Sequence, residues 1–280
     1  MDSESFTGTV SYPAKGREPS SHPRQLGVLI GLFALLYGVG QAAVALSIGG
    51  PEGLLPASLF LLVLLAAGLF FAGVFEPRKD VQQLYVAVAL MPVLTIARLS
   101  FYAGILTAYD PLFVYLLLGV TLIGFRQAWR GPPLVTVERP KRLILALPLV
   151  AILTFGFVDL ALYLPRGPSV PVSGPIWFGA FVAGPVAFLD ELWFRGILQT
   201  RIARLTSPGV AFLVTAALFT AYGAPFGPPG ILPFRLALGL MLGSIAIRED
   251  RLLLALGSRT AIAIAFVVLS PGLLGTSLVV

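Results

Sequence analysis

The chain has 280 residues, of which 57% are hydrophobic and only 11% are charged, and its formal net charge is +6. Soluble proteins carry about 25% charged residues, so this composition excludes an ordinary soluble domain and attributes the positive charge to loops beside anionic lipid headgroups rather than to nucleic-acid binding. The sequence has no cysteine, which excludes disulfides and thiolate chemistry, and it has one histidine, His22.

Residues 1–25 are polar and rich in Ser, Pro and Gly, so we expect a disordered cytoplasmic tail there. The tail does not have the pattern of a signal peptide, because the first apolar run begins near Leu26 and no small-residue cleavage site follows a short apolar core. Nine apolar runs follow, and a run of about 20 residues spans a bilayer. They are about 26–48, 54–75, 82–108, 111–128, 143–164, 175–203, 209–223, 230–248 and 251–270.

These runs predict an all-α fold, a multi-pass transmembrane helical bundle of about 8–9 transmembrane helices. With nine spans, every large cluster of Lys and Arg between the runs falls on the same side, while Arg166 and Arg235 remain on the other. Because cytoplasmic loops are enriched in Lys and Arg, we expect a cell-membrane protein with its N-terminus in the cytoplasm and its C-terminus outside.

Two groups of ionisable residues fall inside the predicted spans. Arg98 and Asp159 each lie about 16 residues from the cytoplasmic ends of the third and fifth spans, at about 1.5 Å per residue. We interpret them as a structural ion pair between those two helices. The depth of Arg259 in the last span agrees within one turn with that of Glu191, so Arg259 is a proposed partner of Asp190 and Glu191.

The second group centres on Asp190, Glu191 and Arg195 in the sixth span. Glu191 and Arg195 are four residues apart and share a helix face. Charged groups at membrane depth cost several kcal/mol, about 2.5–3.5 each on insertion scales, and mark functional sites by default. The simpler alternative is an ion pair that only helps the helices to pack.

Two smaller features predict close packing around these charges. Gly239 and Gly243 form a GxxxG face, which lets helix backbones approach one another. Gly184-Pro185 precedes the acidic pair, and we expect proline to kink the sixth helix there because it lacks a backbone donor.

The stretch Asp190-Glu-Leu-Trp-Phe-Arg-Gly196 resembles the EExxxR(G) motif of the CPBP family, which includes type II CAAX prenyl proteases and bacteriocin-processing or Abi-type proteins. The resemblance runs from about Phe178 to Phe266 and includes the order of the elements that follow the motif. It implies that residues 171–280 form a CAAX-protease-like helical core with intramembrane glutamic endopeptidase activity. Residues 26–170 are then N-terminal transmembrane helices of unassigned role.

Both histidines of the family's pattern are replaced in this chain. In the second motif, FxxxH, Phe219 matches but Gly223 stands at the histidine. In the third motif, Arg259 stands at the histidine and Ala263 at the Asn or Asp that follows four residues later. Asp190 replaces the first Glu of the opening motif. The motif residues that carry over unchanged are Glu191, Arg195 and Phe219.

Peptide hydrolysis needs a general base and a donor to the oxyanion. The resemblance implies Glu191 as the base, with histidine and Asn groups positioning water and the intermediate. Arg259 beside Glu191 would keep that carboxylate ionised, and an arginine does not act as a general acid because it stays protonated. Two carboxylates without His or Cys also fall short of a zinc site, so we expect neither a metal nor a cofactor.

We therefore expect a degenerate member of the family that retains a binding cleft and has lost proteolysis. Its expected partners are membrane lipids and a transmembrane or lipidated protein or peptide. Two alternatives stay open. The first is an active endopeptidase that uses Glu191 with Tyr222 or Thr260 as substitutes. The second is a small transporter or lipid-binding protein that uses the acid–arginine cluster as a polar relay.

Overall fold

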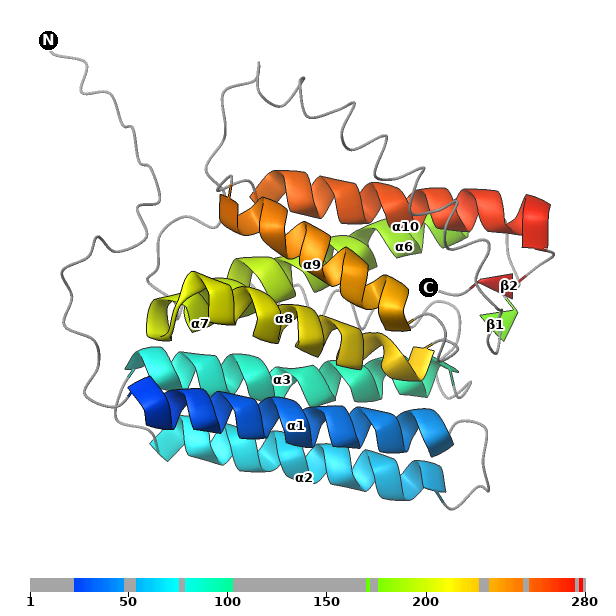
Figure 1. The fold of residues 1–280 in the computed structure, drawn as a ribbon. Helices are drawn as coiled ribbons and strands as arrows, with labels where there is room; N and C mark the ends of the chain where they lie inside the picture. The colour runs from blue at the N-terminus through cyan, green and yellow to red at the C-terminus, as the bar shows by residue number, and fades with distance from the viewer. Residues whose placement is uncertain are drawn as a thin grey trace, which may run out of the picture.

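The computed structural model is almost entirely helical in the part of the chain that it describes (Figure 1). The structure describes residues 23–47, 54–75, 79–102, 170–171, 176–226, 232–248, 252–274 and 277–278. The predicted spans 111–128 and 143–164 lie outside the described residues. The all-α expectation is therefore confirmed for the described part, while the number of about 8–9 transmembrane helices stays a prediction.

Three helices form the N-terminal group, with α2 packed against both of the others. They are α1 (Pro23–Ser47), α2 (Leu54–Phe75) and α3 (Lys79–Tyr102). The sequence predicted the start of the first helix near residue 26, but α1 begins at Pro23. Proline suits the first turn of a helix, because its missing N–H would have no intrahelical partner there. Residues 23–25 are thus helical rather than part of a disordered tail.

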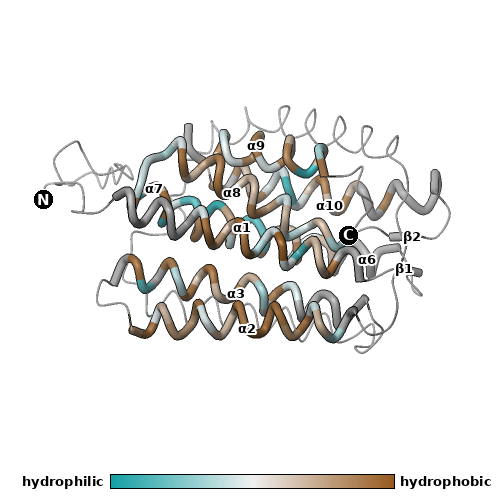
Figure 2. Tube along the Cα trace, turned by 60° about the horizontal axis from the view of Figure 1, so that its bottom comes forward, coloured by the Kyte–Doolittle hydropathy of each residue, from teal (hydrophilic) through white to brown (hydrophobic). Residues whose placement is uncertain are grey.

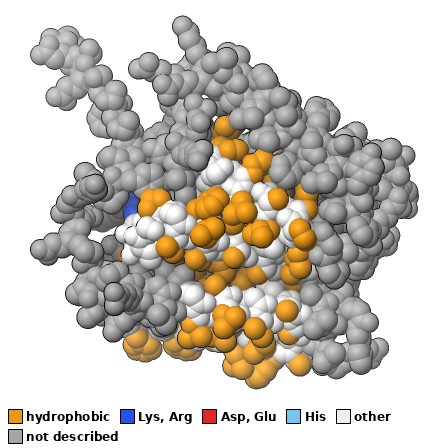
Figure 3. All heavy atoms as spheres, in the orientation of Figure 1, with side chains coloured by type: hydrophobic (Ala, Val, Ile, Leu, Met, Phe, Trp, Pro, Cys, Tyr) orange, Lys and Arg blue, Asp and Glu red, His pale blue; other side chains and the backbone are white. Residues whose placement is uncertain are grey.

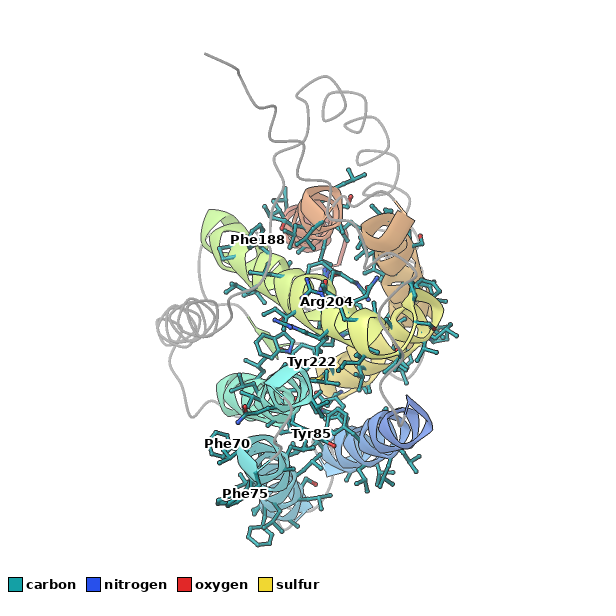
Figure 4. The ribbon with its side chains drawn as sticks, turned by 90° about the vertical axis from the view of Figure 1, so that its left-hand side faces the viewer. Phe70, Phe75, Tyr85, Phe188, Arg204 and Tyr222 are labelled. Carbon is teal, nitrogen blue, oxygen red and sulfur yellow. The ribbon has the colours of Figure 1, made fainter. Side chains whose placement is uncertain are left out.

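The outward side of α2 is apolar. Among the described residues, the stretch Pro56–Phe75 is the one helix long and apolar enough to cross a membrane. Phe70 and Phe75 are 51% and 79% exposed and point away from the bundle (Figure 4). Brown and pale tones dominate α2 in the hydropathy view (Figure 2). A helix that is apolar on its outer side as well as its inner one has the pattern of a membrane span.

In the C-terminal group, the predicted span 175–203 is confirmed as one uninterrupted helical segment over residues 176–205, which consists of three consecutive elements. They are α6 (Ile176–Glu191), a π-helix (Leu192–Gln199) and α7 (Thr200–Leu205). The group continues with α8 (Pro208–Gly223), a 3-10 turn (Ala224–Phe226), α9 (Leu232–Arg248) and α10 (Leu252–Leu274). Helix α6 runs through Pro185, where the expected kink stays a prediction, and the π-helix begins after Glu191.

Local sequence explains where α8 begins. The hydroxyl of Ser207 accepts a hydrogen bond from the backbone N–H of Val210 at 3.3 Å, and Pro208 occupies the first helical position. Both features are typical of helix N-termini. Upstream of this joint, Arg204 is exposed whereas Arg201 is only 3% exposed, so Arg201 is buried in the bundle rather than lying free in a basic loop.

The two groups form one bundle. In the C-terminal group, α6 packs along α10 and α8 packs along α9. Helix α1 contacts α8, and α3 contacts both α7 and the π-helix, which joins the N-terminal group to the rest (Figure 1). A two-residue antiparallel pairing of β1 (Val170–Pro171) with β2 (Ser277–Leu278) connects the segment before α6 to the segment after α10. On the face drawn in Figure 3, the described side chains are mainly hydrophobic.

A buried polar network joins α1 to α3. The hydroxyl of Thr95 accepts a hydrogen bond from Nε2 of Gln41 at 2.7 Å, lies 3.1 Å from the hydroxyl of Tyr37 and donates to the carbonyl of Met91 at 3.1 Å. Tyr37, Gln41 and Thr95 are all 0% exposed. Polar side chains that bond across helices in this way hold membrane helices together.

Thr95→Val should destabilise the protein by about 1–2 kcal/mol, because it leaves Gln41 Nε2 and the Tyr37 hydroxyl without this shared partner in an apolar interior. The apparent Tm in detergent should fall by about 2–8 °C, at about 2–4 °C per kcal/mol. Thr95→Ser keeps the hydroxyl and is the matched control. Equal losses in the two variants would contradict a role for this hydrogen-bonded hydroxyl.

Candidate active site

The acidic pair lies where α6 changes into the π-helix. Asp190 and Glu191 end α6, and the buried residues Trp193–Gln199 follow in the π-helix. A π-helix pairs residues i and i+5, is rare, and is frequently found at functional sites. The hydroxyl of Thr200 donates to the carbonyl of Arg195 at 3.1 Å, five residues earlier, and so supports this wider turn.

Glu191 and Arg195 form a fully buried ion pair. The Nε atom of Arg195 lies 3.3 Å from Oε1 of Glu191 and 3.3 Å from Oε2, and both side chains are 0% exposed. The guanidinium therefore faces both oxygens of the carboxylate. In a buried pair, such attraction offsets the loss of hydration only when other hydrogen bonds satisfy the remaining donors.

Both Nη atoms of Arg195 also donate hydrogen bonds, one to α9 and one within the π-helix itself. Nη2 donates to the carbonyl of Gly239 at 2.8 Å, and Nη1 donates to Oε1 of Gln199 at 3.3 Å. Gln199 in turn donates from Nε2 to the carbonyl of Gly243 at 3.0 Å. The carbonyls of both GxxxG glycines thus accept hydrogen bonds from side chains of the π-helix.

The space beside these glycines explains why larger residues are absent there. A Cβ atom at Gly239 would lie 3.2 Å from Cδ1 of Phe219 and 3.4 Å from the backbone of Ala216 in α8. A Cβ at Gly243 would lie 3.1 Å from the ring of Phe212 and 3.4 Å from Nη1 of Arg195. Helix α9 therefore packs closely enough for its backbone to reach Arg195 and Gln199.

Asp190 accepts a hydrogen bond from a side chain of α8. The hydroxyl of Tyr222 donates to Oδ1 of Asp190 at 3.3 Å, and Tyr222 is 3% exposed. Its ring packs on Phe194, with the ring centroids 5.4 Å apart, and Phe194 also meets the ring of Phe219 edge-on at 5.3 Å. Tyr222 lies inside the bundle in Figure 4. Tyr222, which precedes the position aligned with a histidine by the resemblance, thus provides the hydroxyl that reaches the acidic pair.

Arg259 joins the same cluster from α10. Its Cζ atom lies 5.9 Å from the centroid of the Phe219 ring, and Cζ of Arg195 lies 5.5 Å from that centroid. Arginine at this distance from an aromatic ring makes a cation–π interaction. Arg259, Arg195 and Asp190 are the charged groups that act electrostatically on Glu191. The structure therefore gathers Asp190, Glu191, Arg195 and Arg259 around one side of α8.

Two further residues named in the sequence analysis, Ala263 and Thr260, lie on α10. Ala263 is 8% exposed and stands one turn after Arg259 on α10, so its small side chain is buried. Thr260 faces Gly184, at 3.7 Å from a Cβ placed there. Gly184 precedes Glu191 by about 10 Å along the helix. Thr260 therefore lies beside an earlier part of α6 than the Glu191 carboxylate does. Asp159 lies outside the described residues, as does the side chain of Arg98, so their predicted pair stays a prediction.

Sequence reasoning missed Gln199, although the signal was present. Gln199 follows Arg195 by four residues, the spacing that also separates Glu191 from Arg195. The three polar side chains therefore form a continuous row. In the described part of the chain, no group of three or more His, Cys, Asp or Glu residues lies together as a potential metal site.

Comparison with known proteins gives one match. Residues 172–265 match the family model described as type II CAAX prenyl endopeptidase Rce1-like. The matched stretch begins directly after β1 and ends in α10, so it includes the acidic pair, the π-helix and the glycines of α9. Searches of curated proteins and of solved structures gave no match.

Proposed function

Through residues 172–265 the chain is a member of the CPBP family of CAAX-protease-related membrane proteins, and we propose that it has lost proteolysis and binds a transmembrane or lipidated peptide. We also propose a multi-pass arrangement in the cell membrane, with the N-terminus in the cytoplasm and the C-terminus outside. The distribution of basic residues between the apolar runs supports that orientation.

The observation that carries the proposal is that an arginine acts on Glu191 where the family's pattern has a histidine. The Glu191 carboxylate faces the Nε atom of Arg195 at 3.3 Å from both oxygens, within a fully buried pair. The family's motif contains the same Glu and Arg, so this pair alone does not silence the site; a second arginine, Arg259, also acts on Glu191 where the family's pattern has a histidine. The family's histidines cannot assist, because Gly223 and Arg259 stand at their positions and the one histidine of the chain is His22.

Retention of a costly polar cluster supports a binding role. Two carboxylates and two arginines in an apolar bundle are expensive to maintain at membrane depth. Tyr222, Asp190 and Arg259 would supply donors and acceptors to the backbone of an unwound peptide once the hydrogen bond between Tyr222 and Asp190, which are 3% and 7% exposed, opens towards it. Lipid around the apolar outer side of α2 would keep such a site within the bilayer.

The test is a cleavage and binding assay on the purified full chain in nanodiscs, with a prenylated reporter peptide and a transmembrane reporter peptide. We expect no cleavage above that of the Glu191→Ala variant, and photo-crosslinking of at least one peptide to the C-terminal group. An active family member in the same nanodiscs is the positive control. Turnover by the natural chain that stops on Glu191→Ala would refute the loss of proteolysis.

A second candidate function is residual endopeptidase activity, and the bond from Tyr222 to Asp190 favours it. A phenol hydroxyl 3.3 Å from a carboxylate is a donor that can be redirected to an oxyanion. In this case the natural chain would cleave a reporter, and Tyr222→Phe would abolish the cleavage while preserving the packing of the ring on Phe194.

A further inference from the structure

The space beside Gly223 is filled by an arginine from the neighbouring helix. A Cβ atom at Gly223 would overlap Nη1 of Arg235 and would lie 2.6 Å from its Cζ and 2.8 Å from its Cδ. The backbone at Gly223 has no left-handed φ, so an L-residue would meet no backbone strain there. The position is therefore restricted by the Arg235 side chain and not by its own conformation.

Arg235 belongs to α9 and is partly buried. The sequence predicts that Arg235 lies towards the outer side of the membrane, and in the structure its side chain lies against the end of α8. Position 223 follows Phe219 by one helical turn, so the two positions share a helix face. Arg195 and Arg259 lie over the ring of Phe219, and Arg235 occupies the next place along that face.

We propose that the Arg235 side chain fills the space that a histidine at position 223 would occupy. Gly223 has no side chain and so leaves room for the guanidinium. The proposal rests on the proposed function, since it explains how the former catalytic position is filled. A planar guanidinium replaces a planar imidazole, but the guanidinium stays protonated and so provides shape and charge without proton transfer. The glycine at position 223 and the arginine at position 235 then depend on each other, because both concern the same space. Arg235 acts as a positioning residue that holds α9 against α8.

The test is a double-mutant cycle on the apparent Tm of the full chain in detergent. Gly223→Ala alone should lower the Tm by about 2–4 °C, because the new methyl group makes the guanidinium of the flexible Arg235 side chain move aside. In the Arg235→Ala background the same change should cause no loss, because the space is then open and alanine is the better helix former. Gly257→Ala, on a helical position with open space around it, is the matched control. Equal losses from Gly223→Ala in both backgrounds would overturn the proposal.

A chemical rescue gives an independent readout. Millimolar guanidinium should raise the Tm of Arg235→Ala by occupying the vacated space, and it should not do so in Arg235→Ala with Gly223→Ala. An equal rise in the Tm of both variants would overturn the proposal that Arg235 fills this space. If Arg235→Ala does not fold, Arg235→Val replaces it in both measurements, because a short side chain also clears the space.

The outcomes separate this inference from the proposed function. Cleavage of a reporter by the natural chain would refute the loss of proteolysis and leave the cycle between positions 223 and 235 unchanged. An absence of coupling between these positions would refute the filling of this space by Arg235. The proposed loss of proteolysis would then rest on the other substitutions.

Discussion

Restoring the family's catalytic groups should create peptide hydrolysis only when four changes are made together. These are Gly223→His, Arg259→His, Ala263→Asn and Arg235→Ala. The first three return the imidazoles and the amide that the family's pattern implies. The fourth is required because the Arg235 side chain occupies the space into which any side chain at position 223 must extend. The measurement is cleavage of a prenylated reporter peptide in nanodiscs.

The expected gain is large because the restored groups act together on one transition state. Positioned acid–base groups contribute about 10²–10⁴-fold, and a donor to the oxyanion contributes about 10²–10³-fold. A rate at least about 100-fold above that of the natural chain is therefore expected for the variant with four changes. The variant that retains Arg235 should remain inactive and should be less stable, because the imidazole and the guanidinium compete for one space.

Two controls make the result decisive. Glu191→Gln added to the four changes should abolish the new activity, since it removes the base while keeping the shape of the side chain. Yield and a monodisperse elution profile show whether each variant folds. A folded variant with four changes that cleaves no reporter would contradict the idea that these positions, without the change of the family's first Glu to Asp190, separate this chain from an active relative.

The sequence was sufficient for features that depend on local rules. Apolar runs and Pro or Gly joints predicted the bounds of α2 correctly, at residues 54–75. They placed the start of α1 three residues too late. The spacing of four residues placed Glu191 beside Arg195. Counting residues from the basic ends of the spans placed Arg259 at the depth of Glu191, and the structure brings Arg259 to the same Phe219 ring as Arg195.

Features that depend on which helices meet were outside the reach of these rules. The π-helix at Leu192–Gln199 has no marker residue of its own, because the proline of this region lies earlier, at Pro185. The pairing of Gly223 with Arg235 joins two helices whose rotation the sequence does not give. The network of Tyr37, Gln41 and Thr95 links residues 54 and 58 positions apart, and a single polar residue in an apolar run gives no indication of its partner.

Loss of Arg195 alone should be the most destabilising single change in the site. Arg195→Met keeps the length of the side chain but leaves Glu191 buried without its counter-charge, and the carbonyl of Gly239 and Oε1 of Gln199 lose their donors. Removing one partner of a buried ion pair costs about 3–5 kcal/mol. The apparent Tm in detergent should therefore fall by about 6–20 °C.

The decisive comparison is with the variant that combines Arg195→Met with Glu191→Gln. It should be more stable than Arg195→Met alone, because no uncompensated charge remains in the interior. Arg204→Met is the matched control, since Arg204 is exposed and exposed substitutions change stability by about 0.5 kcal/mol or less. If the single and the combined variants lose the same stability, the contribution of Arg195 lies in its bonds to α9 rather than in the charge of Glu191, and the electrostatic account of the pair is wrong.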